Sequence, residues 1–245
     1  MKKHTLFMMG LVALLLGCNS SATTEETPAE TESTAAAHDG HHGHHATDDN
    51  ISNQHMNRRP FEDLVAGLES DDRAEWQKPD VVLDQLGDLT GKTVMDIGAG
   101  TGYFSFRLAQ RGANVIAADV DDRFQEYIME QKEKTGLDNL ETRQVPYDSP
   151  GLSPAEADVV IIVNTYHHIN DRVEYFAKVL DGLKPGGRLF VVDYKKEETP
   201  HGPPLNHRMS AETVERELNE AGFQEMERDE TTLPYQYMVM AYKKG

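Results

Sequence analysis

A glycine-rich segment at residues 94–104 constrains the fold more strongly than any other part of the 245-residue chain. It reads Val-Met-Asp-Ile-Gly-Ala-Gly-Thr-Gly-Tyr-Phe and separates an apolar run of strand type from a stretch with helical spacing. Glycines at such a turn permit positive φ angles and let the backbone approach a ligand closely. The segment therefore predicts a strand–loop–helix unit whose loop holds a ligand at the carboxyl edge of a sheet.

Strand and helix patterns alternate along most of the chain. The apolar run Val159–Val163 is almost continuous, which is typical of a strand covered on both faces. This alternation predicts an α/β fold with a doubly wound, mostly parallel, seven-stranded sheet. The last two strands are close in sequence and form a hairpin, so the last strand should be antiparallel. The expected strands are 93–97, 114–118, 140–144, 158–164, 188–193, 223–228 and 235–242, and the expected helices between them are 103–110, 122–134, 172–183 and 211–221.

A carboxylate follows the glycine segment at a characteristic distance. Asp119 lies 21 residues after Gly98, at the end of the second predicted strand. An acid at that place can accept hydrogen bonds from both hydroxyls of a ribose. Dinucleotide sites share this arrangement, but their Gly-x-Gly-x-x-Gly fingerprint requires a third glycine where this chain has Tyr103.

The pattern Asp-x-Gly-x-Gly-x-Gly, from Asp96 to Gly102, resembles motif I of the class I S-adenosylmethionine (SAM) dependent methyltransferases. The resemblance extends over roughly residues 56–245, with 158–164 similar to the family's fourth strand and 183–189 to the turn into its fifth. Residues 191–204 resemble small-molecule members related to quinone-biosynthesis methyltransferases. The resemblance implies a Rossmann-like methyltransferase fold and an enzyme that moves the methyl group of SAM to a small-molecule acceptor.

The resemblance also assigns roles to individual residues. The glycine loop with Asp96 should surround the methionine part of SAM, and Asp119 should hold its ribose. The family often has an acid after the third strand for the adenine, where this chain has Pro146, so Asp148 or Tyr147 and backbone groups are expected to replace it. The residues expected to bind the cofactor are Asp96, Gly98, Ala99, Gly100, Gly102, Tyr103, Asp119, Val120, Tyr147, Asp148 and Asn164.

Two histidines are the candidates for the acceptor side. His167 and His168 follow the fourth predicted strand, where family members place residues that face the transferable methyl group. A base is needed only if the acceptor must lose a proton, and histidine has a suitable pKa. The alternative is that both histidines begin the next helix and pack locally. An oxygen and nitrogen metal site formed by His167, Asp193 and His207 is a further possibility that sequence spacing leaves open.

Three arginines and a tryptophan precede the glycine loop: Arg58, Arg59, Arg73 and Trp76. These residues belong to the predicted N-terminal helices, which can cap the cofactor in this fold family. The alternative for Trp76 is an ordinary core position.

The N-terminus has the features of a bacterial lipoprotein signal peptide. Lys2 and Lys3 precede an apolar run at residues 6–16 that is too short to span about 30 Å of hydrocarbon. The run ends in Leu-Leu-Gly-Cys, which resembles a lipobox. The resemblance implies cleavage after residue 17, lipidation of Cys18 and attachment to a membrane of the cell envelope. The alternative is an uncleaved apolar N-terminus with a buried cysteine.

Residues 18–54 are predicted to be a disordered tether before a domain at 55–245. The stretch 19–54 holds seven acidic residues and no lysine or arginine. Five histidines at 38–45 can chelate transition metals weakly, although a solvated linker is the simpler interpretation. The net charge of −18 argues against a nucleic-acid partner. Two alternative functions remain open at this point: a catalytically silent SAM- or nucleoside-binding lipoprotein, and a His-rich metal-binding lipoprotein.

Overall fold

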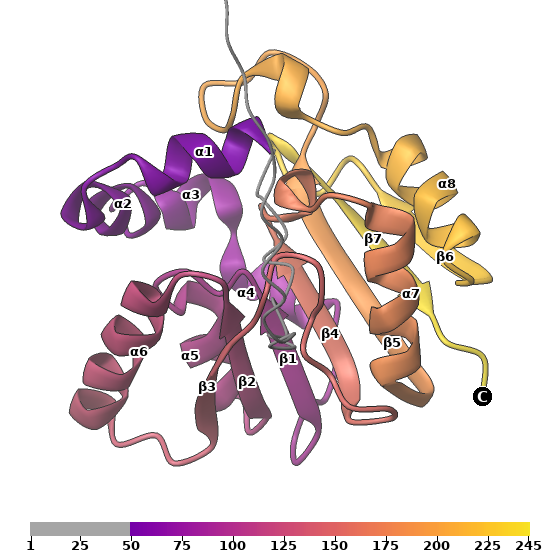
Figure 1. Cartoon of the computed structure of the whole chain (residues 1–245), viewed down its shortest axis with the longest axis horizontal. Helices are drawn as coiled ribbons and strands as arrows, with labels where there is room; N and C mark the ends of the chain where they lie inside the picture. The colour runs from indigo at the N-terminus through magenta and orange to yellow at the C-terminus, as the bar shows by residue number, and fades with distance from the viewer. Residues whose placement is uncertain (1–49) are drawn as a thin grey trace, which may run out of the picture. The chain divides into compact units, whose positions relative to one another are not determined.

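Seven strands form one mixed sheet in the order β3-β2-β1-β4-β5-β7-β6 (Figure 1). Neighbouring strands from β3 to β5 are parallel, whereas β7 is antiparallel to both β5 and β6. The predicted α/β fold, with its antiparallel last strand, is confirmed. The strands are β1 (Thr93–Ile97), β2 (Asn114–Asp119), β3 (Leu140–Gln144), β4 (Ala157–Val163), β5 (Leu183–Tyr194), β6 (Glu225–Asp229) and β7 (Gln236–Tyr242).

The computed structural model describes residues 50–245, except for the side chains of Ile51 and His55. The expected signal peptide at 1–17, the lipidation site Cys18, the histidine cluster at 38–45 and most of the expected tether lie outside the described residues. Within the described part, the first helix already begins at Ile51, before the expected domain boundary at residue 55. No helix of residues 50–245 combines the length and apolar character that crossing a bilayer requires.

Helices cover both faces of the sheet, and a further group lies over one edge of it (Figure 1). Helix α1 is capped by the side chain of Asn50, which accepts a hydrogen bond from the backbone N–H of Ser52. The helices are α1 (Ile51–Asn57), α2 (Phe61–Leu68), α3 (Arg73–Gln77), α4 (Pro79–Asp84), α5 (Tyr103–Gln110), α6 (Asp122–Thr135), α7 (Arg172–Gly182) and α8 (Ala211–Glu220), with short 3₁₀ turns η1 (Tyr166–His168) and η2 (Leu205–His207).

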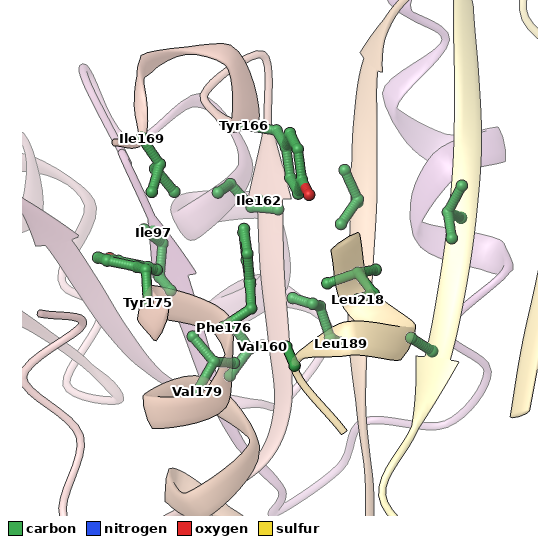
Figure 2. Packing of buried hydrophobic residues seen from close by; sticks show 14 of the residues in the cluster. Ile97, Val160, Ile162, Tyr166, Ile169, Tyr175, Phe176, Val179, Leu189 and Leu218 are labelled. Atoms are coloured by element: carbon green, nitrogen blue, oxygen red, sulfur yellow. The ribbon is translucent and has the colours of Figure 1, made fainter. Parts of the chain in front are cut away.

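Successive side chains of each central strand enter different cores. In β1, Met95 and Ile97 belong to the core beneath α7 and α8, whereas Val94 belongs to the core with α4, α5 and α6. This alternation follows from the two-residue period of a strand. Figure 2 shows the first of these cores, in which Phe176 and Val179 of α7 pack close to strand β4. Both faces of the sheet are therefore buried, which explains the continuous apolar run in β4.

The strand order reverses direction at β1. From β1 the chain builds β2 and β3 on one side of the sheet, and it later adds β4 and β5 on the other. The carboxyl ends of β1 and β4 therefore border the crevice that doubly wound sheets leave at such a reversal. The glycine segment follows β1 directly, so this topology places it at the crevice.

Strand β5 differs from the prediction at its start. It begins at Leu183, so the predicted turn at 183–189 is a part of the strand. The pairing passes from Ala157–Leu183 directly to Val159–Arg188, which marks a bulge in β5. Gly186 has a φ of 74°, and this left-handed conformation lets the extra residues loop out while the strand continues.

Candidate active site

A cavity lies at the carboxyl ends of β1, β2 and β4, beneath α1 and α2. It encloses about 1030 Å³ of empty space, part of it open to solvent, which is comparable to the larger small-molecule sites. Ile97, Asp119 and Val163 contribute from the strand ends, and Asn53 and Leu64 contribute from the helices above. The cavity therefore occupies the crevice that the topology predicts.

The glycine loop forms one wall of this cavity. Gly98, Gly100 and Gly102 have φ angles of 71°, 54° and 82°, all in the left-handed region. A Cβ atom on Gly98 would lie 2.4 Å from the Cγ2 and Oγ1 atoms of Thr165, which follows β4. Position 98 therefore requires glycine for its φ angle and for the close approach of the loop after β4.

Asp119 closes the cavity at the end of β2. Its Oδ2 accepts a hydrogen bond from the backbone N–H of Gly100 at 2.8 Å, and its Oδ1 accepts one from the N–H of Asp121 at 3.0 Å. Burial raises the pKa of Asp119 to about 6, and these hydrogen bonds oppose the rise. The carboxylate is thus held in one orientation and keeps lone pairs that a ligand can use.

Asp96 lies behind the loop and does not line the cavity. Its carboxylate accepts a hydrogen bond from the Oγ of Ser105 at 2.6 Å and joins β1 to α5. Burial raises the pKa of Asp96 to about 6, and the nearby carboxylate of Asp119 adds to the rise. Gly102 is the N-cap residue before α5 and, like Tyr103, lies outside the cavity lining.

Arg73 of α3 is the cationic side chain in the cavity wall. Its guanidinium lies 3.9 Å from the ring centroid of Tyr103 and donates hydrogen bonds to the backbone oxygen of Leu68 and to Oε1 of Gln77. It is 6% exposed. Of the four residues expected to cap the cofactor, Arg73 alone lines the cavity, while Trp76 stacks on His201 at a centroid distance of 5.0 Å.

The hydroxyl of Thr101 is buried in the cavity wall, and no hydrogen-bond partner for it exists among the described residues. Thr101 is only 2% exposed. A buried hydroxyl without a partner costs free energy, roughly 1–3 kcal/mol. A polar ligand in the cavity would supply the missing partner.

Three amides form a closed ring beside the cavity. Gln77 Nε2 donates to Gln236 Oε1 at 2.8 Å, Gln236 Nε2 donates to Asn164 Oδ1, and Asn164 Nδ2 donates to Gln77 Oε1 at 3.3 Å. This ring joins α3, the end of β4 and the start of β7, and it holds Asn164 at a φ of 57°. The sequence carries no signal for Gln77 and Gln236, because their local patterns match those of exposed glutamines.

The segment after β3 contributes Val145, Pro146 and Tyr147 to the lining. The Tyr147 hydroxyl accepts a hydrogen bond from Nδ2 of Asn57 at 3.2 Å. Asp148, by contrast, is exposed and lies outside the lining. The structure thus brings Tyr147 to the cavity and leaves Asp148 outside, because the chain turns away after Tyr147.

The two histidines after β4 have different environments. His168 lines the cavity. His167 does not, since its Nδ1 lies 3.0 Å from each carboxylate oxygen of Asp193 in a buried pair. His207 instead contacts Ser52, with 3.2 Å between its Nδ1 and the serine Oγ. Within residues 50–245, no three His, Cys, Asp or Glu side chains are grouped to hold a metal ion.

Residues 94–187 match a family model described as a methyltransferase domain. The chain carries a methyltransferase domain. Its fold agrees closely with a crystal structure of a SAM dependent methyltransferase from Aquifex aeolicus, at a TM-score of 0.70 and 26% identity. That similarity covers 76% of this chain and 100% of the other. The similarity supports a methyltransferase fold for this chain, with the strand order and glycine loop described above.

Parts of the chain are also similar to curated methyltransferases. A tRNA U34 carboxymethyltransferase from Desulfotalea psychrophila is 32% identical over 135 residues, which cover 54% of this chain and 41% of the relative. A ubiquinone biosynthesis O-methyltransferase from Acinetobacter baylyi is 29% identical over 108 residues, which cover 44% of this chain and 45% of the relative. The chain thus spans less than half the length of these relatives, so the similarity identifies the domain and leaves the acceptor open.

Proposed function

We propose that this protein binds SAM in the cavity and transfers its methyl group to a small-molecule acceptor. The observation that carries the proposal is the joint placement of the left-handed glycine loop and the buried carboxylate of Asp119 around one cavity. The loop presents backbone to a ligand, and the carboxylate can accept two hydroxyl hydrogen bonds. Both groups meet at the reversal point of the sheet, where such folds bind ligands.

The lining residues fit the parts of SAM. Asp119 would hold the ribose hydroxyls, and Val120, Val145 and Tyr147 would enclose the adenine. The cation of Arg73 and the unpartnered hydroxyl of Thr101 lie in the same wall as the glycine loop, and they suit the carboxylate end of the methionine part. Gly98, Ala99 and Gly100 complete this cradle.

The remaining cofactor candidates act less directly in this proposal. Asp96 lies behind the loop, where its hydrogen bond with Ser105 positions the start of α5. Gly102 permits the turn into that helix, and Tyr103 packs against Arg73. Asn164 lines the cavity and is held by the amide ring at the end of β4. Asp148 is assigned no contact with the cofactor.

Bound SAM supplies an electrophilic methyl group on a sulfonium. The protein's contribution is then mainly positioning, since an in-line displacement depends on alignment of the reacting groups. Helices α1 and α2 line the cavity from above and cover part of it. The net charge of −18 disfavours polyanionic acceptors, which supports a small acceptor without multiple negative charges.

Isothermal titration with S-adenosylhomocysteine tests cofactor binding, and turnover of labelled SAM with a mixed acceptor panel tests methyl transfer. Binding together with labelled product is expected. Binding without turnover of any acceptor would favour the silent SAM-binding alternative. Absence of binding by the folded protein would refute the proposal.

We also infer that Cys18 anchors the protein to a bacterial membrane in the cell envelope. The support is the N-terminal sequence alone: two lysines, an apolar run and Leu-Leu-Gly-Cys. Several acyl chains on one residue give stable attachment, whereas a single chain gives marginal binding. Mass spectrometry of the N-terminal peptide should find a modified Cys18 as the first residue, and Cys18→Ser should release the protein from membrane fractions. An unprocessed form that begins at Met1 would contradict the inference.

A further inference from the structure

The amide of Asn53 holds His168 at two points. Its Nδ2 donates to the backbone oxygen of His168 at 3.0 Å, and its Oδ1 lies 2.7 Å from Nδ1 of the same residue. A backbone oxygen can only accept a hydrogen bond, so the amide nitrogen must face it. The amide oxygen therefore faces the ring, and Nδ1 of His168 must be the donor. This contact assigns the proton of the imidazole to Nδ1.

The other ring nitrogen then carries a lone pair. Burial lowers the pKa of His168 to about 3, and the neighbouring His167 lowers it further, so the ring is neutral. A neutral imidazole with its proton on Nδ1 has an acceptor at Nε2. Within the described part of the chain, no group donates a hydrogen bond to this Nε2. Since His168 lines the cavity, the free edge of its ring is available to a ligand there.

The imidazole ring of His168 also packs against the ring of His167, which is itself held in place. The rings of His167 and His168 lie 4.3 Å apart between centroids, and His167 is held by the carboxylate of Asp193 at 3.0 Å. The backbone oxygen of His167 accepts a hydrogen bond from Nδ2 of Asn50 at 3.2 Å. Helix α1 and strand β5 thus fix the histidine pair from two sides before any ligand arrives.

The side chains that line the cavity around His168 are uncharged, while the carboxylate of Asp193 lies behind them and pairs with His167. The charged groups that line the cavity elsewhere are Arg73, Asp119 and Asp121, which belong to the end proposed for the cofactor. The neutral lining residues of this part come from α1, α2, η1 and the residue after η1: Asn53, Met56, Asn57, Leu64, Leu68, His168 and Ile169.

We propose that this neutral lobe is the acceptor subsite of the proposed methyltransferase, and that Nε2 of His168 selects an uncharged acceptor that donates a hydrogen bond through a hydroxyl or amine group. The inference rests on the proposed function for its cofactor end. A molecule without a donor leaves Nε2 of the half-buried ring without a hydrogen bond from the ligand, and an anion meets its lone pair. The site therefore discriminates by what the acceptor can donate.

The test uses the full chain, labelled with ¹⁵N-histidine and saturated with S-adenosylhomocysteine. NMR should show His168 as the neutral Nδ1–H form. Matched probes are then added: phenol with anisole, benzyl alcohol with benzyl methyl ether, aniline with N,N-dimethylaniline, and benzoate. Only phenol, benzyl alcohol or aniline should move the Nε2 signal. The proposal would be overturned if His168 were found in the Nε2–H form. It would also be overturned if the donor-free partners gave equal shifts, if benzoate alone gave a shift, or if no probe gave one.

Two substitutions of the same residue sharpen the result. His168→Asn keeps an amide N–H where Nδ1 donates to Asn53 but has no acceptor at the position of Nε2. His168→Gln reaches that position with an amide oxygen. The asparagine variant should lose tenfold or more in probe affinity, and the glutamine variant should recover part of it; equal affinities would overturn the proposal. Cofactor affinity, measured on the same samples, separates a failed subsite from a failed methyltransferase assignment.

Discussion

The carboxylate of Asp119 accepts a hydrogen bond at 2.8 Å from the backbone N–H of Gly100, so the end of β2 and the glycine loop form one wall of the cavity. The same carboxylate also accepts the N–H of Asp121 at 3.0 Å. The backbone thereby orients Asp119 before a ligand arrives, which lowers the ordering cost of binding.

Asp119→Ala should weaken binding of S-adenosylhomocysteine by about 1–3 kcal/mol, or roughly 5- to 150-fold, because ribose hydroxyls would lose their acceptor in a partly buried site. Isothermal titration measures the change. Asp122→Asn is the matched control, since Asp122 is an exposed acid nearby that does not line the cavity. Unchanged affinity in the alanine variant would remove Asp119 from the binding site.

Gly98→Ala should reduce both stability and cofactor binding. The substitution combines a φ of 71° with a Cβ placed 2.4 Å from Thr165. Gly136→Ala is the control, because Gly136 has a similar φ of 68° but nothing within 4 Å of the added carbon. In denaturant unfolding, we expect the control to lose about 1 kcal/mol of unfolding free energy and Gly98→Ala to lose more. Equal losses would show that the loop yields to Thr165.

The affinity for S-adenosylhomocysteine should depend on pH near 6. Burial raises the pKa of Asp119 and of Asp96 to about 6, so both carboxyls are largely ionised at pH 7.5 and protonated at pH 5. A ribose hydroxyl binds the ionised acceptor more strongly. The dissociation constant should be flat above pH 7 and rise by up to about tenfold per pH unit below 6 for each proton that must be lost on binding. Titrations from pH 5 to 8 measure this, and Asp119→Asn should flatten the curve; a flat curve for the unchanged protein would contradict the assignment.

The stability of the ligand-free domain should show the opposite trend. A carboxyl whose pKa is higher in the folded state than in the unfolded state binds more protons when folded. The contribution of Asp119 is therefore fully present below about pH 4 and is lost as the pH rises through 6. Comparing the unfolding free energy of the unchanged protein with that of Asp119→Asn isolates this slope, and a difference that does not vary with pH would contradict it.

Breaking the amide ring should destabilise the domain. Gln77→Ala removes the donor to Gln236 and an acceptor of Asn164 and Arg73, which leaves the buried amide of Gln236 and the half-buried amide of Asn164 incompletely paired. We expect a loss of about 1–3 kcal/mol in denaturant unfolding, with the exposed Gln110→Ala as the control. The double variant Gln77→Ala/Gln236→Ala should lose less unfolding free energy than the two single variants lose together, because each single substitution already breaks the same ring. Simple additivity would show that the ring is not a cooperative unit.

The sequence alone determined the fold class and the location of the ligand loop. The predicted elements Thr93–Ile97, Tyr103–Gln110 and Leu140–Gln144 occur with those bounds. These predictions succeeded because they depend on local periodicity and on the backbone requirements of glycine, which neighbouring residues in the chain express directly.

Only the tertiary structure decided which polar side chains meet at the cavity. His167 and His168 are adjacent in sequence, yet one pairs with Asp193 of β5 and the other lines the cavity under α1. The partner that assigns the proton of His168 is Asn53, which is 115 residues away in the chain. Local patterns record which face of an element is buried, but such pairings depend on how helices and strands distant in sequence pack together. For this reason the motif indicated the kind of domain, whereas the packing of α1 against η1 formed the part of the cavity that is proposed to receive the acceptor.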